Sequence, residues 1–63
     1  MDLPTAELSS LASALDDIER RVIEVASRFE GTAREDLANA LYEVERSLST
    51  ASRRLEKLLR EIG

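Results

Sequence analysis

The side chains best suited to chemistry in this chain are two carboxylates and one phenol: Glu19, Glu45 and Tyr42. The sequence contains no histidine and no cysteine. It therefore lacks the groups that most often act as general base, thiol nucleophile or soft metal ligand. Carboxylate metal sites in helical bundles also recruit histidines. We accordingly predict no enzyme, no metal, no cofactor and no small-molecule substrate.

Glu19 and Glu45 would come close together if the chain folds back on itself between them. One interpretation is that both carboxylates are solvated at a rim and partnered by Arg20, Arg46 or an arginine of a second chain. Another is that they form a polar layer that fixes how two chains pair. For Tyr42, we expect the ring to pack across a helix interface and the hydroxyl to bond at its edge.

Three arginines, Arg46, Arg53 and Arg60, are spaced seven residues apart and would share one helix face. The stripe can be a solvated face that offsets the acidic first part of the chain. Alternatively, it can follow the phosphates of a nucleic acid. The formal net charge of −4 and the absence of aromatic residues between the arginines argue against nucleic acid.

The elements that must position these groups follow from the apolar spacing. Apolar residues recur at alternating steps of three and four, as in a coiled coil. In heptad notation, the a positions are Leu8, Leu15, Val22 and Phe29, then Leu41, Leu48, Leu55 and Ile62. The d positions are Leu11, Ile18 and Val25, then Leu37, Val44, Ala51 and Leu58. We predict an all-α, antiparallel two-helix hairpin in which the a and d positions together form the seam.

The connection between the two helices is predicted at Gly31, a natural left-handed stop. Thr32 and Glu35 have the spacing of a capping box for the helix that follows. We predict a single domain over residues 1–63, with helix one at about 4–30, the turn at 31–32 and helix two at about 33–62.

A bare hairpin of 63 residues shares one seam and leaves each helix largely exposed. Chains this small are usually stabilised by disulfides, metals or association. We therefore expect a homodimer forming a four-helix bundle. The predicted interface lies on the side next to the seam and combines small residues with solvent-exposed apolar residues. Small residues there would let another helix approach closely. Its residues are Ala12, Glu19, Ile23, Ala26, Ala38, Tyr42, Glu45 and Leu59.

The function favoured by this pattern is a non-enzymatic protein–protein interaction or oligomerisation module, which self-associates or binds a protein partner. The alternative is a small regulator that binds nucleic acid, or a nucleic-acid-binding protein, through the arginine stripe. No run of about eighteen apolar residues is present, so we expect no membrane span. The start, Met-Asp-Leu-Pro, lacks the features of a secretory signal, and we expect a cytoplasmic location.

Overall fold

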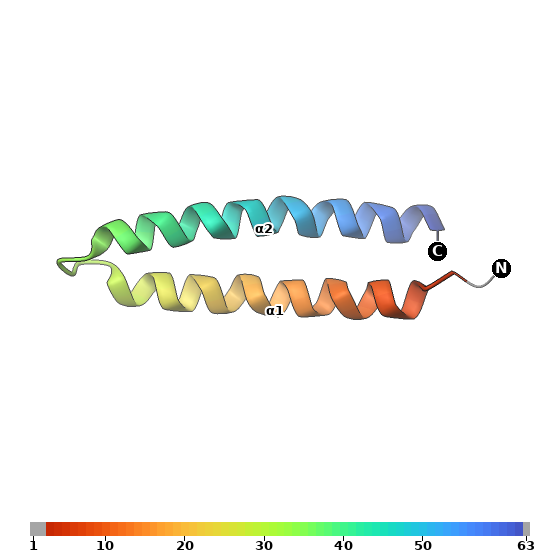
Figure 1. Ribbon diagram of the computed structural model, residues 1–63, viewed down its shortest axis with the longest axis horizontal. Coiled ribbons are helices and arrows are strands. Elements are labelled where there is room, and N and C mark those ends of the chain that lie inside the picture. Colours follow the sequence, from red (N-terminus) through yellow and green to blue (C-terminus); the bar gives the residue numbers. More distant parts are fainter. Residues whose placement is uncertain (1–2, 63) are drawn as a thin grey trace.

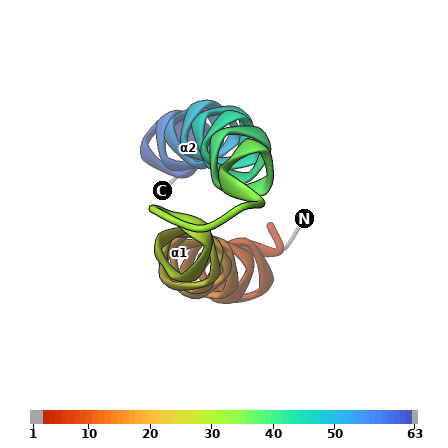
Figure 2. The ribbon, with the colours of Figure 1, turned by 90° about the vertical axis from the view of Figure 1, so that its left-hand side faces the viewer.

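The computed structural model describes residues 3–62, which form two long antiparallel helices (Figure 1). Helix α1 spans Thr5–Phe29 and helix α2 spans Glu35–Ile62. The hairpin measures 54 Å along its longest axis and 15 by 11 Å across. Seen from the turn, the helices lie side by side as a single pair (Figure 2). The predicted all-α two-helix hairpin is confirmed; a second hairpin beside it remains a prediction.

Helix α1 begins at the Leu3-Pro4 segment. The amide of Thr5 donates to the carbonyl of Leu3 at 2.7 Å, and the amide of Leu8 donates to the carbonyl of Pro4 at 3.0 Å. Proline is well placed here because a helix start leaves its first amides without partners in any case.

The turn depends on Gly31, whose φ of +71° lies in the left-handed region. A Cβ at residue 31 would contact nothing within 4 Å, so the need for glycine comes from the backbone alone. The predicted left-handed stop at Gly31 is confirmed.

Helix α2 begins at Glu35, two residues later than expected, because Thr32 bonds differently from the predicted capping box. Its hydroxyl donates to the carbonyl of Phe29 at 2.6 Å and accepts from the amide of Arg34 at 3.2 Å. The guanidinium of Arg34 also makes two 3.1 Å hydrogen bonds to the Asp36 carboxylate. These bonds extend the turn to Arg34.

The helix contact is rotated from the predicted seam. The a positions are half-buried as expected, but among the d positions only Leu37 is. In place of the d positions, the e positions lie at the contact between the helices. We call them the e row: Ala12, Glu19 and Ala26 of α1, with Ala38, Glu45, Ser52 and Leu59 of α2. The prediction that the d positions line the hairpin seam was therefore wrong. Small side chains in the e row let the two helices pack closely there.

The interior of the hairpin is thin. Among the described residues, Ala26, Ala38 and Ser52 are the buried ones, at 0%, 1% and 5% exposure. None of the described large side chains is fully buried. The hydrophobic effect inside one hairpin is therefore limited, since it grows with the apolar area removed from water.

Candidate interaction surface

Most residues of the predicted interface lie between the two helices of the hairpin. Ala26 and Ala38 are buried, and Ala12, Glu19, Glu45, Tyr42 and Leu59 are half-buried, by the chain itself. Ile23 is the exposed member, at 43%. The small residues mark a close helix approach, as we predicted, but the approaching helix belongs to the same chain.

The largest apolar surface is the row of d positions, which we call the d row: Leu11, Ile18, Val25, Leu37, Val44, Ala51 and Leu58. Five of its large side chains are 39–57% exposed, namely Leu11, Ile18, Val25, Val44 and Leu58. Both helices present their d positions on the same side of the hairpin, because the a and e positions of both face inward. An apolar stripe thus runs along most of the hairpin, next to the half-buried a positions.

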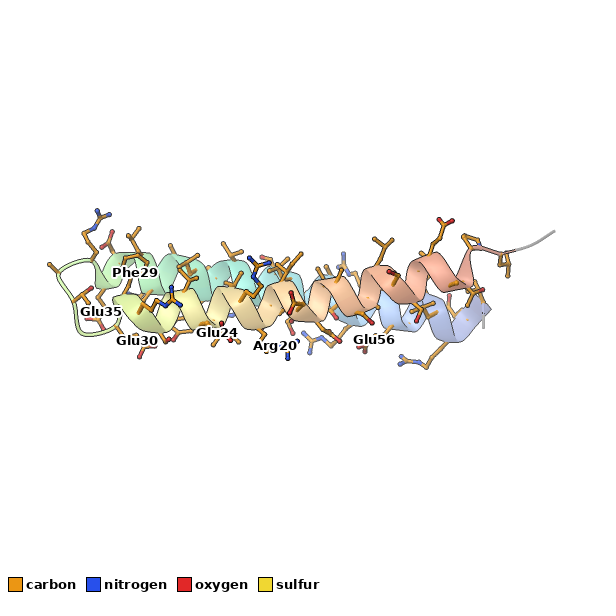
Figure 3. All side chains as sticks on the ribbon, turned by 90° about the horizontal axis from the view of Figure 1, so that it is seen from below. Arg20, Glu24, Phe29, Glu30, Glu35 and Glu56 are labelled. Atoms are coloured by element: carbon orange, nitrogen blue, oxygen red, sulfur yellow. The ribbon has the colours of Figure 1, made fainter. Side chains whose placement is uncertain are left out.

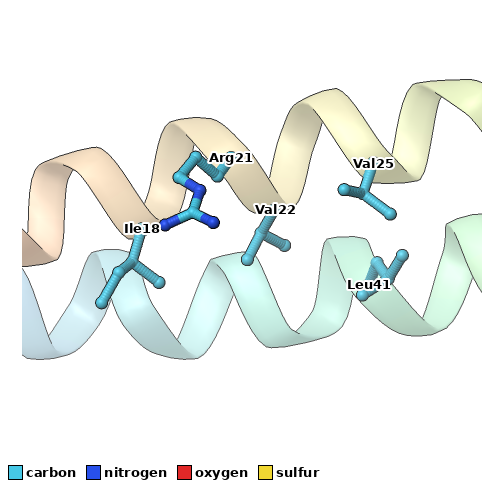
Figure 4. Close-up of a pocket in the computed structure, with 5 residues that line it drawn as sticks. All are labelled: Ile18, Arg21, Val22, Val25 and Leu41. Atoms are coloured by element: carbon cyan, nitrogen blue, oxygen red, sulfur yellow. The ribbon is translucent and has the colours of Figure 1, made fainter.

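The stripe contains a groove of about 360 Å³ near the middle of the hairpin. Ile18, Val22 and Val25 of α1 line it together with Leu41 of α2, and the stem of Arg21 forms its border (Figure 4). Four of these five side chains are aliphatic. The groove therefore suits apolar side chains from another helix.

The opposite side of the hairpin is polar and closed by hydrogen bonds between the helices. The hydroxyl of Ser52 donates to the Asp16 carboxylate at 3.3 Å, and the phenol of Tyr42 donates to the Glu30 carboxylate. The predicted hydroxyl bond of Tyr42 at the edge is present. Glu30 lies with Arg20 and Glu56 along one long edge of the molecule (Figure 3).

Glu19 and Glu45 approach each other in the middle of the hairpin. Partial burial raises the pKa of the Glu19 carboxyl above its ordinary 4.5, and the negative charges of Asp16 and Glu45 raise it further. The nearby Ser52 hydroxyl lowers this pKa, and the side chain of Glu45 raises it again. The sequence pattern predicted the Glu19–Glu45 pair but missed Asp16 and Ser52, whose positions on facing helix surfaces were the available signal.

The arginine stripe lies on the outer face of α2, with Arg46, Arg53 and Arg60 all exposed. Arg46 forms an ion pair with Glu43 at 3.4 Å. That pair offsets part of the positive charge at one end of the stripe. Exposed pairs of this kind add little to stability.

Between residues 3 and 62, no group of three or more acidic side chains is arranged to hold a metal ion. Over the same residues, neither helix is long and apolar enough to cross a membrane. Glu19, Glu45 and Asp16 thus form a local cluster of carboxylates without a metal-binding geometry.

No protein-family model matches the chain, and no curated protein or solved structure shows significant similarity to it.

Proposed function

We propose that this protein is a non-enzymatic interaction module, a helical hairpin that associates with another helical surface through its d row. One observation carries the proposal: Leu11, Ile18, Val25, Val44 and Leu58 are each 39–57% exposed along a single side. Surface leucines occur singly on many proteins, whereas contiguous apolar surface marks interaction sites. The expected cytoplasmic location belongs to the same proposal.

The energetics support this assignment. Covering a half-exposed aliphatic side chain contributes on the order of 1 kcal/mol, so the five exposed members of the d row could contribute several. The hairpin gains little from its own interior, where two alanines and one serine are buried among residues 3–62. Association through the d row supplies the apolar burial that the hairpin lacks.

The test compares two isoleucines of α1 that are equally exposed, at 43% each. Ile18 belongs to the d row and Ile23 lies on the polar side. We would replace each in turn with a photo-crosslinking phenylalanine derivative, irradiate the expressing cells, and sequence the adducts. Adducts at position 18 and none at position 23 are expected. Adducts at neither position, or at 23 alone, would contradict the proposed function.

The alternative function uses the stripe of Arg46, Arg53 and Arg60. Its support is the shared exposed face of α2, which could follow phosphates. It predicts binding to nucleic acid, or to a nucleic-acid-binding protein, that weakens with salt and is lost in a variant with all three arginines changed to serine. Unaltered binding by that variant would rule this function out.

A further inference from the structure

We propose that the d row binds a second copy of the same chain, with the turns of the two hairpins at opposite ends of a four-helix bundle. This inference rests on the proposed function and specifies its partner. It assigns the interface to the d row, on the opposite side of the hairpin from Ile23 and Tyr42.

The d row has the symmetry that a two-fold dimer requires. In α1, Leu11 and Val25 lie seven residues to either side of Ile18. In α2, the row is symmetric about the point between Ser47 and Leu48. Val44 and Ala51 lie equally far from that point along the sequence, as do Leu37 and Leu58. A two-fold contact needs a self-complementary patch of this kind.

The two centres of symmetry lie opposite each other in the hairpin. Asp16 contacts Ser52, and Glu19 interacts with both Glu45 and Ser52. Ile18 therefore lies opposite the segment between Glu45 and Ser52, which contains the centre of the α2 row. A single two-fold axis across the hairpin can thus relate both helices to their copies. Ile18 would then face Ile18 of the second copy, and Val44 would face Ala51.

Charges bordering the d row favour turns at opposite ends. In that arrangement α1 packs antiparallel on α1 of the second copy, which brings the exposed Glu7 beside Arg28 twice. In the same arrangement Arg21, at the border of the groove, would lie over the small Ala14 of the second copy. With the turns at the same end, α1 would pack on α2 and place Glu7 beside Glu61. Opposite charges brought together at an interface favour the arrangement that pairs them.

The groove lies beside the proposed axis, since Ile18 is one of its lining residues. In the dimer, each copy's groove receives apolar side chains from α1 of the other. Ile18 would occur twice at the centre, so one substitution changes the interface in two places.

The first experiment measures mass and affinity by sedimentation equilibrium for the wild type, Ile18→Ser and Ile23→Ser. The wild type should have the mass of two chains at tens of micromolar. Ile18→Ser should raise the dissociation constant at least about tenfold, and Ile23→Ser less than about twofold. Circular dichroism checks that both variants remain helical. Equal effects of the two substitutions, or a wild-type monomer at all concentrations, would overturn the inference.

The second experiment measures the orientation of the two copies. The native chain has no cysteine, so Ala33→Cys at the exposed turn gives one spin label per chain. With turns at opposite ends, the label separation should approach the 54 Å length of the hairpin. Turns at the same end would bring the labels within about 25 Å, which would refute the arrangement.

The outcomes also separate this inference from the proposed function. Suppose that adducts at position 18 contain another protein and that the chain sediments as a monomer. The proposed function would then hold, and a second copy as the partner would be refuted. Absence of adducts at position 18 would remove both.

Discussion

The two long sides of this hairpin have the same backbone and opposite chemistry. On one side, Asp16 and Ser52, and Tyr42 and Glu30, join the helices through hydrogen bonds. On the other side, the d row presents side chains such as Leu11 and Val44 to solvent. Hydrogen bonding satisfies the polar side within one chain, whereas the apolar side gains stability only if something covers it. A helix pair can thus be closed by hydrogen bonds on one side while its other side still exposes apolar side chains.

The largest effect is expected at the buried alanine contact that separates the two sides. Ala26→Leu should lower the free energy of unfolding by about 1–3 kcal/mol, because the added atoms force the helices apart where no space exists. Ala6→Leu, on an exposed face of the same helix, is the matched control. Urea unfolding monitored by circular dichroism measures both. If the two variants are equally stable, the helices do not meet along the e row.

A second prediction concerns the turn that holds the two sides in place. Gly31→Val should cost about 1–2 kcal/mol, because a β-branched residue is strained at φ +71°. Gly31→Asn should cost less, because asparagine tolerates the left-handed region better. Thermal unfolding of the pair measures the difference. Neither substitution should change which side of the hairpin associates, and equal melting temperatures would count against a left-handed residue 31.

A third prediction concerns the Ser52 hydroxyl on the polar side. Ser52→Ala removes a 3.3 Å hydrogen bond and should lower stability by about 0.5–1.5 kcal/mol. It should also raise the pKa of Glu19 further, because the Ser52 hydroxyl lowers that pKa in the native protein. Carboxyl carbon chemical shifts followed by NMR over a pH titration would show the shift. Ser13→Ala, on an exposed face of α1, is the control, and an unchanged Glu19 pKa would contradict the expected effect of the Ser52 hydroxyl on Glu19.

The smallest effect is a pH dependence at Glu19. Its pKa is raised in the folded state by partial burial and by Asp16 and Glu45. The folded chain therefore binds this proton more tightly than the unfolded chain. The ionised carboxyl weakens the fold at neutral pH, and the fold recovers stability as pH falls through the raised value. Glu19→Gln should be slightly more stable than wild type at pH 7, and the gain should shrink as pH falls through the raised pKa toward the ordinary 4.5.

Asp36 opposes this trend in wild type, since the Arg34 hydrogen bonds lower its pKa. Its contribution is present above its ordinary pKa and is lost as pH falls. Comparing Glu19→Gln with wild type cancels that background. Glu24→Gln, at an exposed carboxyl, is the control, and a gain that persists unchanged at low pH would exclude the proposed origin.

The helices and their connection could be predicted from the sequence, whereas the side that faces the partner helix could not. The apolar spacing and Gly31 determine a hairpin with little ambiguity. Apolar or small residues occupy the a and d positions and, apart from Glu19 and Glu45, the e positions. A helix can therefore turn either a and d or a and e toward its neighbour. The sequence does not say which pair is used within the chain. The outcome depends on how closely Ala26 and Ala38 let the backbones approach.

The rotation of the helices also determines which side chains meet at the candidate interaction surface. The proximity of Glu19 and Glu45 follows from antiparallel pairing alone and survives a small rotation of the helices. The assignment of an outward face to Ala12, Ala26 and Ala38 depends on the rotation and did not survive it. The bond from Ser52 to Asp16 could not be predicted, because it forms only in the rotated arrangement of the helices.

An interior lined by alanines also has a mechanical consequence. Short side chains interlock less than long ones, so the contact of Ala26 with Ala38 resists lengthwise sliding of the helices only weakly. Two hydrogen bonds oppose such sliding: one from Tyr42 to Glu30 near the turn, and one from Ser52 to Asp16 farther along the hairpin. Together these two hydrogen bonds set the lengthwise register of the helices. They therefore determine which d-row side chains of α1 lie level with those of α2.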